Sequence, residues 1–237
     1  MSSRIARTVL VTGGTGALGG AVTRRLLDDG HRVAVTWVVK EEAEALRESI
    51  GETERLMLAE TDVTDPASIA ETVEDVRAEL GAVEVLVHLV GAWKGGEAVH
   101  EVSLDTWDRM LDLNLRSALL CSQAVLPSMR NRGWGRVVLV SSRTAREDRA
   151  GQAAYAIAKA GVAVLAETIA EENTGLDVTA NVVAPSTLDT PANRAALPDA
   201  DFDAWVPPDD VAASVSFLTS QEAGQLRGAW LPVYGSA

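Results

Sequence analysis

Short runs of apolar, mostly β-branched residues alternate with longer amphipathic stretches along almost the whole chain. Such alternation is typical of strands and helices that follow one another, and continuous apolar strands are typical of parallel sheets buried on both faces. The pattern therefore predicts an α/β fold with a doubly wound parallel sheet of about seven strands, flanked by helices. The strands are expected at Thr8–Thr12, Arg32–Val38, Arg55–Glu60, Val83–His88, Arg136–Ser141, Asp177–Val183 and Ala229–Val233.

Helices are expected between these strands. One has a clear start signal, because Asp65 stands at a capping position and Pro66 follows at the first helical position. With 237 residues and no repeat, low-complexity segment or linker, the chain is expected to form one domain over residues 1–237. The predicted helices are Ala17–Asp29, Glu41–Ser49, Pro66–Leu80, Leu104–Arg130, Gln152–Glu172 and Asp209–Ser220.

Composition excludes several classes of protein. The formal net charge is −13, and no basic cluster is visible that could neutralise phosphates, which argues against a nucleic-acid partner. No apolar run approaches the roughly 18 residues that cross a bilayer, so no membrane partner is expected. The start of the sequence lacks a cleavable apolar segment, which favours a cytoplasmic protein. The single cysteine, Cys121, is interpreted as a core residue, and no metal site is predicted.

A glycine-rich segment, VTGGTGALGG, follows the first predicted strand and opens the first predicted helix. In this context glycines let backbone amides approach a pyrophosphate at a helix N-terminus. The segment resembles the TGxxxGxG fingerprint of the short-chain dehydrogenase/reductase family, with an alanine at the middle glycine. The resemblance implies a Rossmann-type domain that binds NAD(P), with cofactor contacts from Thr12, Gly13, Thr15, Gly16, Ala17, Leu18 and Gly19.

The strongest motif pairs Tyr155 with Lys159, four residues apart on one face of a predicted helix. Ser142 lies thirteen residues before Tyr155, just past a buried strand, where the ligand crevice of open α/β sheets forms. A nearby ammonium is expected to lower the pKa of the phenol, and a serine hydroxyl can donate to a substrate oxygen on which charge develops. The spacing is similar to the family's catalytic group, which implies catalytic roles for Ser142, Tyr155 and Lys159, with Asn114 as a fourth member that supports a water-mediated relay to the lysine.

The same resemblance implies cofactor contacts after the later strands. Asp62 and Val63 look like the family's adenine-contacting pair, and Gly91 ends the segment HLVG, where the family usually has NNAG. His88 of that segment is interpreted mainly as a structural substitute for an asparagine, with a catalytic role as the alternative. The segment PSTLDT is similar to the family's PGxxxT, which implies that the nicotinamide and its surroundings are contacted by Pro185, Thr187 and Thr190.

The choice between NAD and NADP depends on the end of the second strand. An acidic residue there would bind the ribose hydroxyls of NAD and repel the 2′-phosphate of NADP, but Trp37 stands at this point. Lys40 follows as a candidate phosphate partner, whereas the basic residue that many NADP-using relatives carry inside the glycine loop is absent. The balance predicts a slight preference for NADP(H) over NAD(H).

Residues 190–208 stand where the family has its mobile substrate loop. Phe202 and Trp205 of this loop, together with Trp93, are candidates for an aromatic wall over the substrate, and Arg143 and Arg194 are candidates for binding an anionic group. The alternatives are that the aromatic residues pack the loop onto the domain and that the arginines are solvated. The loop and the segment GAWKGG also look like those of dihydropteridine reductases, a much shorter match.

Together these motifs predict an oxidoreductase that moves hydride between a nicotinamide cofactor and a small-molecule carbonyl or alcohol, such as a 3-oxoacyl-type ketone. Two alternatives stay open. One is an enzyme like the dihydropteridine reductases, although these usually lack the serine found here at Ser142. The other is a non-catalytic sensor of NAD(P), although such proteins tend to lose the tyrosine or lysine. Apolar surfaces of the helices Leu104–Arg130 and Gln152–Glu172, which the family buries between subunits, predict a homotetramer or homodimer.

Overall fold

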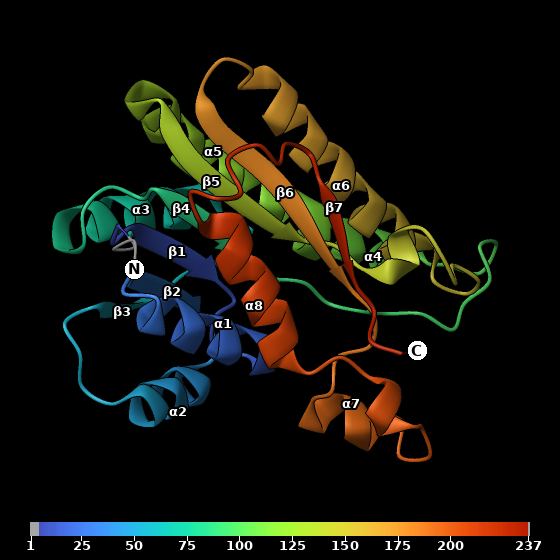
Figure 1. Cartoon of the computed structure of the whole chain (residues 1–237). Coiled ribbons are helices and arrows are strands. Elements are labelled where there is room, and N and C mark those ends of the chain that lie inside the picture. Colours follow the sequence, from blue (N-terminus) through green and yellow to red (C-terminus); the bar gives the residue numbers. More distant parts are fainter. Residues whose placement is uncertain (1–4, 237) are drawn as a thin grey trace.

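A seven-stranded sheet runs through the middle of the computed structural model, which describes residues 5–236 (Figure 1). Neighbouring strands are all parallel, in the order β3-β2-β1-β4-β5-β6-β7. The chain order reverses between β1 and β4, and open sheets of this kind bind ligands at such a point, beyond the C-terminal ends of the strands. The predicted doubly wound sheet is confirmed, with strands β1 (Thr8–Thr12), β2 (Arg32–Trp37), β3 (Leu56–Glu60), β4 (Val85–His88), β5 (Trp134–Val140), β6 (Asp177–Pro185) and β7 (Trp230–Val233).

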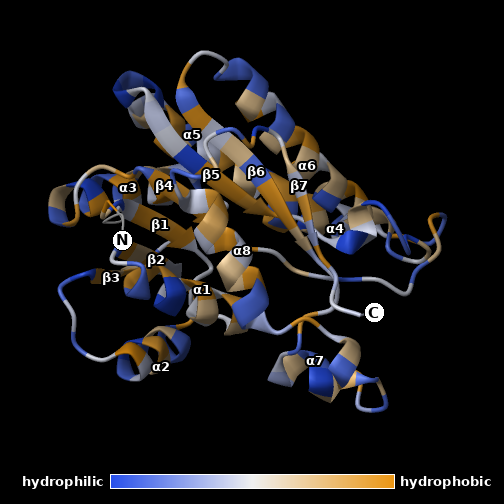
Figure 2. Cartoon of the chain, viewed as in Figure 1, coloured by the Kyte–Doolittle hydropathy of each residue, from blue (hydrophilic) through white to orange (hydrophobic). Residues whose placement is uncertain are grey.

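Helices cover both faces of the sheet and leave a buried apolar layer on each side (Figure 1). Colouring by hydropathy shows that the strands are largely apolar and that polar residues gather on the outer faces of the helices, as burial on both faces requires (Figure 2). One face carries α1 (Ala17–Asp28), α2 (Lys40–Ile50) and α8 (Pro208–Thr219), and the other carries α3 (Pro66–Glu79), α5 (Ser117–Arg132) and α6 (Ala153–Glu172).

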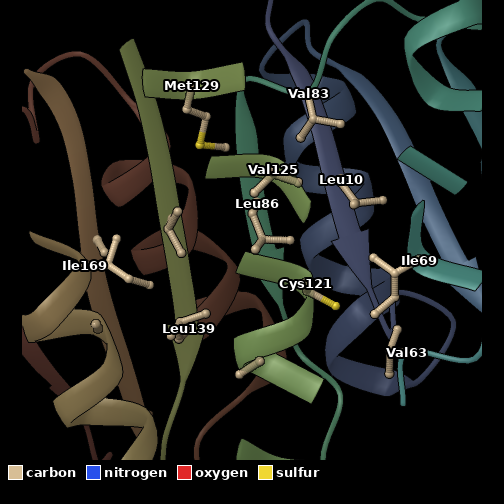
Figure 3. Close-up of a cluster of buried hydrophobic side chains, with 14 of the residues drawn as sticks. Leu10, Val63, Ile69, Val83, Leu86, Cys121, Val125, Met129, Leu139 and Ile169 are labelled. Carbon is tan, nitrogen blue, oxygen red and sulfur yellow. The ribbon is translucent and has the colours of Figure 1, made fainter. Parts of the chain in front are cut away.

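The second of these layers contains the single cysteine. Leu86 of β4 and Leu139 of β5 point towards α5, which contributes Cys121 and Val125 to the same cluster (Figure 3). Cys121 is fully buried, and burial raises the pKa of its thiol to about 12. The structure thus agrees with its interpretation as a core residue.

The structure differs from the predicted helices in two places. The long helix expected over Leu104–Arg130 is interrupted, because α4 (Leu104–Leu111) passes into a π turn at Asp112–Arg116 before α5 begins. A short helix, α7 (Pro191–Ala196), was not predicted, although Thr190 caps it and Pro191 occupies its first turn. The other predicted strands and helices begin and end within two residues of the observed bounds. Residues 1–4, part of the region that argued against a leader segment, and residue 237 lie outside the described residues.

Among residues 5–236, α6 is the one helix whose length and composition would suffice to cross a membrane. Half of its apolar stretch is buried inside the domain, where it packs on β5 and β6. Core helices of soluble proteins pass the same test of length and hydropathy, and α6 contributes Val162, Ala166 and Ile169 to the buried apolar cluster, so it is a core helix.

Candidate active site

The four residues of the predicted catalytic group come from three segments that meet beyond the C-terminal edge of the sheet. Asn114 lies in the π turn, Ser142 follows β5, and Tyr155 and Lys159 occupy the first two turns of α6. Gly91, after β4, shows how closely two of them approach: a Cβ atom there would lie 2.6 Å from Asn114 Oδ1 and 3.0 Å from Lys159 Nζ. Only glycine leaves room for both side chains.

Asn114 is fully buried and holds the chain that leaves β4. Its Nδ2 donates to the carbonyl oxygens of Ala92 and Met110, both at 2.9 Å, and its Oδ1 accepts from the backbone amide of Ala92 at 3.2 Å. The amide side chain therefore satisfies both backbone groups of Ala92. The π turn is the device that points Asn114 at this segment, and π turns inside helices are frequent at functional sites.

Lys159 is a nearly buried cation, with 4% of its surface exposed. Its Nζ donates to the carbonyl oxygen of Val140 at 2.9 Å and lies 5.9 Å from the centre of the Tyr155 ring. Its own backbone carbonyl accepts from Ser141 Oγ at 2.7 Å, which ties α6 to the end of β5. Burial lowers the pKa of the Lys159 ammonium to about 8.

The pKa of the Tyr155 phenol is raised in the structure, whereas the sequence led us to expect that it is lowered. Burial raises the pKa of Tyr155, and a hydrogen bond with Ser142 lowers it by a smaller amount. The expected lowering of the Tyr155 pKa by Lys159 does not appear among these causes, and the Lys159 ammonium is directed at the Val140 carbonyl. Ser142 Oγ also accepts from the backbone amide of Thr144 at 3.2 Å, which leaves the hydroxyl proton of Ser142 for the site.

The buried ammonium predicts a particular dependence of stability on pH. The pKa of Lys159 is lower in the folded chain, about 8, than its ordinary value of 10.5, so unfolding takes up a proton between these values. The free energy of unfolding should therefore rise with pH across that window. Lys159→Met removes the charge and should be more stable than the wild type at pH 7 by roughly 2 kcal/mol. Urea unfolding at pH 7 and pH 9.5 measures this, and an advantage that fails to shrink at the higher pH would contradict it.

The glycine-rich loop fits a dinucleotide. Gly14 and Gly19 allow α1 to pack closely, since a Cβ atom would lie 2.6 Å from Val35 at the first and 2.4 Å from the carbonyl oxygen of Gly13 at the second. Gly16 is the N-cap of α1, no side chain caps the helix, and within residues 5–236 no atom beyond its chain neighbours lies within 4 Å of where its Cβ would stand. The amides of the first helical turn are therefore open to a pyrophosphate.

Further predicted cofactor residues follow β3 and β6, which lie on opposite sides of the point where the chain order reverses. Asp62 follows β3 and accepts from the amide and hydroxyl of Thr64, which lowers the pKa of its carboxyl group, and Val63 is buried behind it. Pro185 ends β6, and the carbonyl of Thr187 accepts from the amide of Val206 at 2.9 Å. Thr190 Oγ1 accepts from the amide of Asn193, so this side chain serves as the cap of α7.

A carboxylate that sequence reasoning missed faces the glycine-rich loop. Thr15 Oγ1 donates to Glu42 Oε2 at 2.9 Å, from the first turn of α2. Lys40, the predicted phosphate partner, is turned towards Glu44 at 3.7 Å with 71% of its side chain exposed. Trp37 ends β2 and is half-buried. The premise that no acidic residue reaches this region is therefore wrong. Glu42 lies five residues after the end of β2, and the first turn of α2 places its carboxylate beside Thr15 of the glycine-rich loop.

The aromatic candidates for the substrate side do not form one wall. Phe202 and Trp205 contact each other with ring centres 4.9 Å apart, and Trp205 is 8% exposed, as expected of a residue that packs the loop onto the domain. Trp93 is 64% exposed on a different loop, where its Nε1 donates to Gln152 Oε1 at 2.6 Å. Because Gln152 precedes Tyr155 by three residues, Trp93 is the aromatic candidate that the structure tethers near the Tyr155 phenol.

The two candidate arginines both have partners. Arg194 forms two hydrogen bonds with the Asp189 carboxylate, at 2.5 and 2.8 Å, and its guanidinium carbon lies 4.7 Å from the centre of the Phe202 ring. The ion pair lowers the pKa of Asp189 and raises that of Arg194. Arg143 lies 3.2 Å from the Asp148 carboxylate. These pairs reduce the positive charge that either arginine offers to an anionic substrate. No cluster of three or more His, Cys, Asp or Glu residues suited to a metal ion occurs within residues 5–236.

Comparison with known proteins bears on the whole arrangement. The family model of the short chain dehydrogenases matches residues 7–201. The chain is 34% identical to a 3-oxoacyl-[acyl-carrier-protein] reductase of Salmonella typhimurium, over 97% of this chain and 96% of that protein. It is also 34% identical to a 3-oxoacyl-[acyl-carrier-protein] reductase of Mycobacterium bovis, over 98% and 92%. A solved short-chain dehydrogenase/reductase from Serratia marcescens superimposes with a TM-score of 0.88 at 29% identity, covering 99% of this chain and all of that one.

Fold, glycine-rich loop and catalytic group together define an NAD(P)-type oxidoreductase that acts on CH–OH or C=O groups. The chain belongs to the short-chain dehydrogenase/reductase family.

Proposed function

We propose that this enzyme reduces a ketone carbonyl of the 3-oxoacyl type, with Tyr155 as the proton donor. The observation that carries the proposal is the meeting of Ser142, Tyr155 and Lys159 beyond the C-terminal edge of the sheet, where Ser142 is hydrogen-bonded to the phenol and the Lys159 ammonium lies 5.9 Å from the centre of its ring. The pKa of Tyr155 stays above its ordinary value, so the phenol holds its proton at neutral pH and can donate it to a carbonyl oxygen. The names of the 34% identical relatives support a 3-oxoacyl substrate.

A bound reduced nicotinamide supplies the hydride in this reaction. The Ser142 hydroxyl donates to the substrate oxygen as negative charge develops there, and Tyr155 transfers its proton to the same oxygen. Lys159 keeps a positive charge near the phenol below its pKa of about 8, which stabilises the phenolate left after transfer. Asn114 holds the backbone of Ala92, the residue that follows Gly91 beside the Lys159 ammonium.

A substrate panel tests the proposal. Purified enzyme is mixed with NADH or NADPH and a 3-oxoacyl thioester, an acetoacetyl ester, a simple ketone or a quinonoid dihydropterin, and the loss of absorbance of the reduced cofactor is followed. Turnover of the 3-oxoacyl compounds with the highest kcat/KM supports the proposal. Preferential reduction of the dihydropterin would instead support an enzyme like the dihydropteridine reductases. Cofactor binding without turnover on any substrate would favour a non-catalytic sensor of NAD(P).

For the cofactor we propose NAD(H), which reverses the slight preference for NADP(H) predicted from Trp37 and Lys40. Glu42 lies 23 residues after Gly19, close to the spacing at which an acidic residue binds the adenosine ribose in dinucleotide-binding folds. Its contact with Thr15 supports a position beside that ribose. The carboxylate can accept hydrogen bonds from ribose hydroxyls, whereas a 2′-phosphate would meet like charge. Lys40, exposed and paired with Glu44, offers little compensation.

The Glu42→Gln variant tests this assignment. The ratio of kcat/KM for NADPH over NADH should rise about fivefold to tenfold, since the lost repulsion between partly solvated charges is on the order of 1 kcal/mol. Calorimetric titration with adenosine 2′,5′-bisphosphate and with AMP provides a readout without turnover. Glu41→Gln, an exposed neighbour in the same helical turn, is the matched control. A ratio that changes less than about twofold, or a wild type that prefers NADPH, would overturn the proposal.

We further propose a soluble, cytoplasmic homodimer or homotetramer assembled through α4, α5 and α6. Leu104 of α4, Leu119 of α5, and Ile157 and Val164 of α6 are large apolar side chains that are 40–77% exposed in the single chain. Apolar residues so placed on neighbouring helices favour an isologous two-fold contact. Light scattering at micromolar concentration measures the mass. A monomer would contradict the proposal, and Val164→Glu should dissociate the oligomer without unfolding the chain.

A further inference from the structure

His88 stands at the centre of a buried series of hydrogen bonds that joins the glycine-rich loop to the π turn that contains Asn114. It ends β4, is 1% exposed, and lies beside Thr12 of β1 in the sheet. Its Nδ1 lies 2.7 Å from Thr12 Oγ1, and its Nε2 lies 3.1 Å from Ser117 Oγ at the start of α5. Thr12 opens the glycine-rich loop, and Ser117 directly follows the π turn that contains Asn114.

The direction of these hydrogen bonds follows from Ser117. The Ser117 hydroxyl donates to the carbonyl oxygen of Leu113 at 2.8 Å, so it accepts from His88. The imidazole proton is therefore on Nε2, and Nδ1 accepts from the Thr12 hydroxyl. Burial and the charge of Lys159 lower the pKa of His88 to about 3, so the ring is neutral throughout the pH range in which the protein would work.

The Ser117 hydroxyl also replaces a bond that the π turn removes. The backbone amide of Ser117 donates to Asp112, five residues back, and so does not reach Leu113 as it would in a regular α-helix. The Ser117 hydroxyl donates to the Leu113 carbonyl instead. His88 fixes the orientation of this hydroxyl, and the turn it stabilises carries Asn114 to Ala92, beside Gly91 and Lys159.

We propose that His88 is a positioning residue: it holds the π turn in the geometry that presents Asn114 to the segment after β4 and thereby keeps Lys159 aligned with Tyr155. The inference rests on the proposed reductase function, and it assigns His88 a part in the turnover rate and not in proton transfer. The imidazole contacts no reacting group, because both of its nitrogens are bound to Thr12 and Ser117.

Two amide variants of His88 test its hydrogen bonds with Thr12 and with Ser117 separately. In His88→Asn the amide reaches the place of Nδ1 and can keep the bond with Thr12, whereas in His88→Gln it reaches the place of Nε2 and can keep the bond with Ser117. We expect His88→Asn to lower kcat about tenfold while the KM for the cofactor changes less than about twofold, because small misplacements of catalytic groups reduce rates strongly. His88→Gln should retain at least about a third of wild-type kcat, since the bond that holds the π turn remains.

Ser117→Ala breaks the same link from its other end and leaves the imidazole in place. Its kcat should match that of His88→Asn, and the double variant should be no slower than either single one, as expected of residues that act through one interaction. Equal kcat for the wild type, His88→Asn and Ser117→Ala, or a loss in His88→Gln as large as in His88→Asn, would overturn the inference. Thermal melting of each variant shows whether it is folded at the assay temperature.

A measurement without turnover keeps this inference distinct from the proposed reaction. The amide of Ala92 is hydrogen-bonded to Asn114 Oδ1, so its hydrogen exchange reports directly on Asn114. Exchange at Ala92 should be several-fold faster in His88→Asn and Ser117→Ala than in the wild type and His88→Gln, whatever the substrate. Unchanged protection in all variants would exclude the link from His88 to Asn114, even if the enzyme reduces ketones as proposed.

Discussion

Replacing Tyr155 with phenylalanine is expected to lower kcat by roughly a hundredfold or more, because general acid catalysis by a placed side chain contributes about that much. The substitution removes only the hydroxyl that donates the proton. The ring keeps its packing on α6, and Lys159 keeps its bond to Val140, so the dissociation constant of the cofactor should change little. Single-turnover kinetics at saturating cofactor, together with a titration of cofactor binding, measure the two quantities separately.

Tyr234 provides the matched control, because the chain has only two tyrosines. It follows β7, and its ring centre lies 5.8 Å from the guanidinium carbon of Arg143. Tyr234→Phe deletes the equivalent phenolic hydroxyl from a residue outside the predicted catalytic group, so it should retain most of the wild-type kcat. If Tyr155→Phe keeps more than about a tenth of wild-type kcat, proton transfer by Tyr155 is excluded as the main source of acid catalysis.

The strands were predictable because parallel strands buried on both faces need continuous apolar segments, and those segments are visible in the sequence. The break in the predicted helix Leu104–Arg130 was not, because it depends on partners far along the chain. The π turn is held by Asn114 on Ala92 and by Ser117 on the Leu113 carbonyl, and the His88 contact exists only once β4 lies beside α5. Helical periodicity alone favours an uninterrupted helix there.

In the candidate site, too, local sequence patterns were predictable, whereas contacts between distant segments were not. The tyrosine and lysine four residues apart and the glycine-rich loop are local patterns, whereas the approach of Asn114 and Lys159 to the same glycine is visible only in the structure. Glu42 was missed because the search for an acidic residue stopped at the strand end, whereas the contact with Thr15 is made by the first turn of α2. Sequence also gave no reason to expect the Trp93–Gln152 contact, which joins two loops after different strands.

Arg136 is the residue whose loss should destabilise the fold most. It is fully buried at the start of β5, at the opposite edge of the sheet from the catalytic group. Its guanidinium donates to the carbonyl oxygens of Ser220, Gly135 and Asp177, and it lies 2.9 Å from the Asp177 carboxylate. These bonds tie the end of α8 to β5 and β6. Nothing in the sequence distinguishes this arginine from one at an exposed strand end, because its partners are backbone groups from distant segments.

Arg136→Met should lower the free energy of unfolding by about 2–4 kcal/mol, since it leaves buried carbonyls without a donor while the half-exposed Asp177 carboxylate can return to water. For a chain of this size that corresponds to a fall in Tm of roughly 5–15 °C. Arg7 is the matched control: its guanidinium lies 3.8 Å from the other neighbour of Arg136, the Trp134 ring, but its ion pair with Glu84 is only partly buried. Arg7→Met should therefore cost less free energy of unfolding than Arg136→Met, because water reaches both partners of the Arg7–Glu84 pair.

The Arg136 variants should lose stability against unfolding but keep the wild-type kcat. Because Arg136 lies at the far edge of the sheet from Tyr155, kcat of Arg136→Met should equal that of the wild type at temperatures where both are folded, and its loss should appear only in urea unfolding and thermal melting. Arg136→Lys should recover little, because one ammonium on a flexible chain cannot reach the three carbonyls that the planar guanidinium bridges. A Tm for Arg136→Met within about 2 °C of wild type would mean that water replaces the guanidinium at these carbonyls without loss, and that β5 is held by its apolar faces alone.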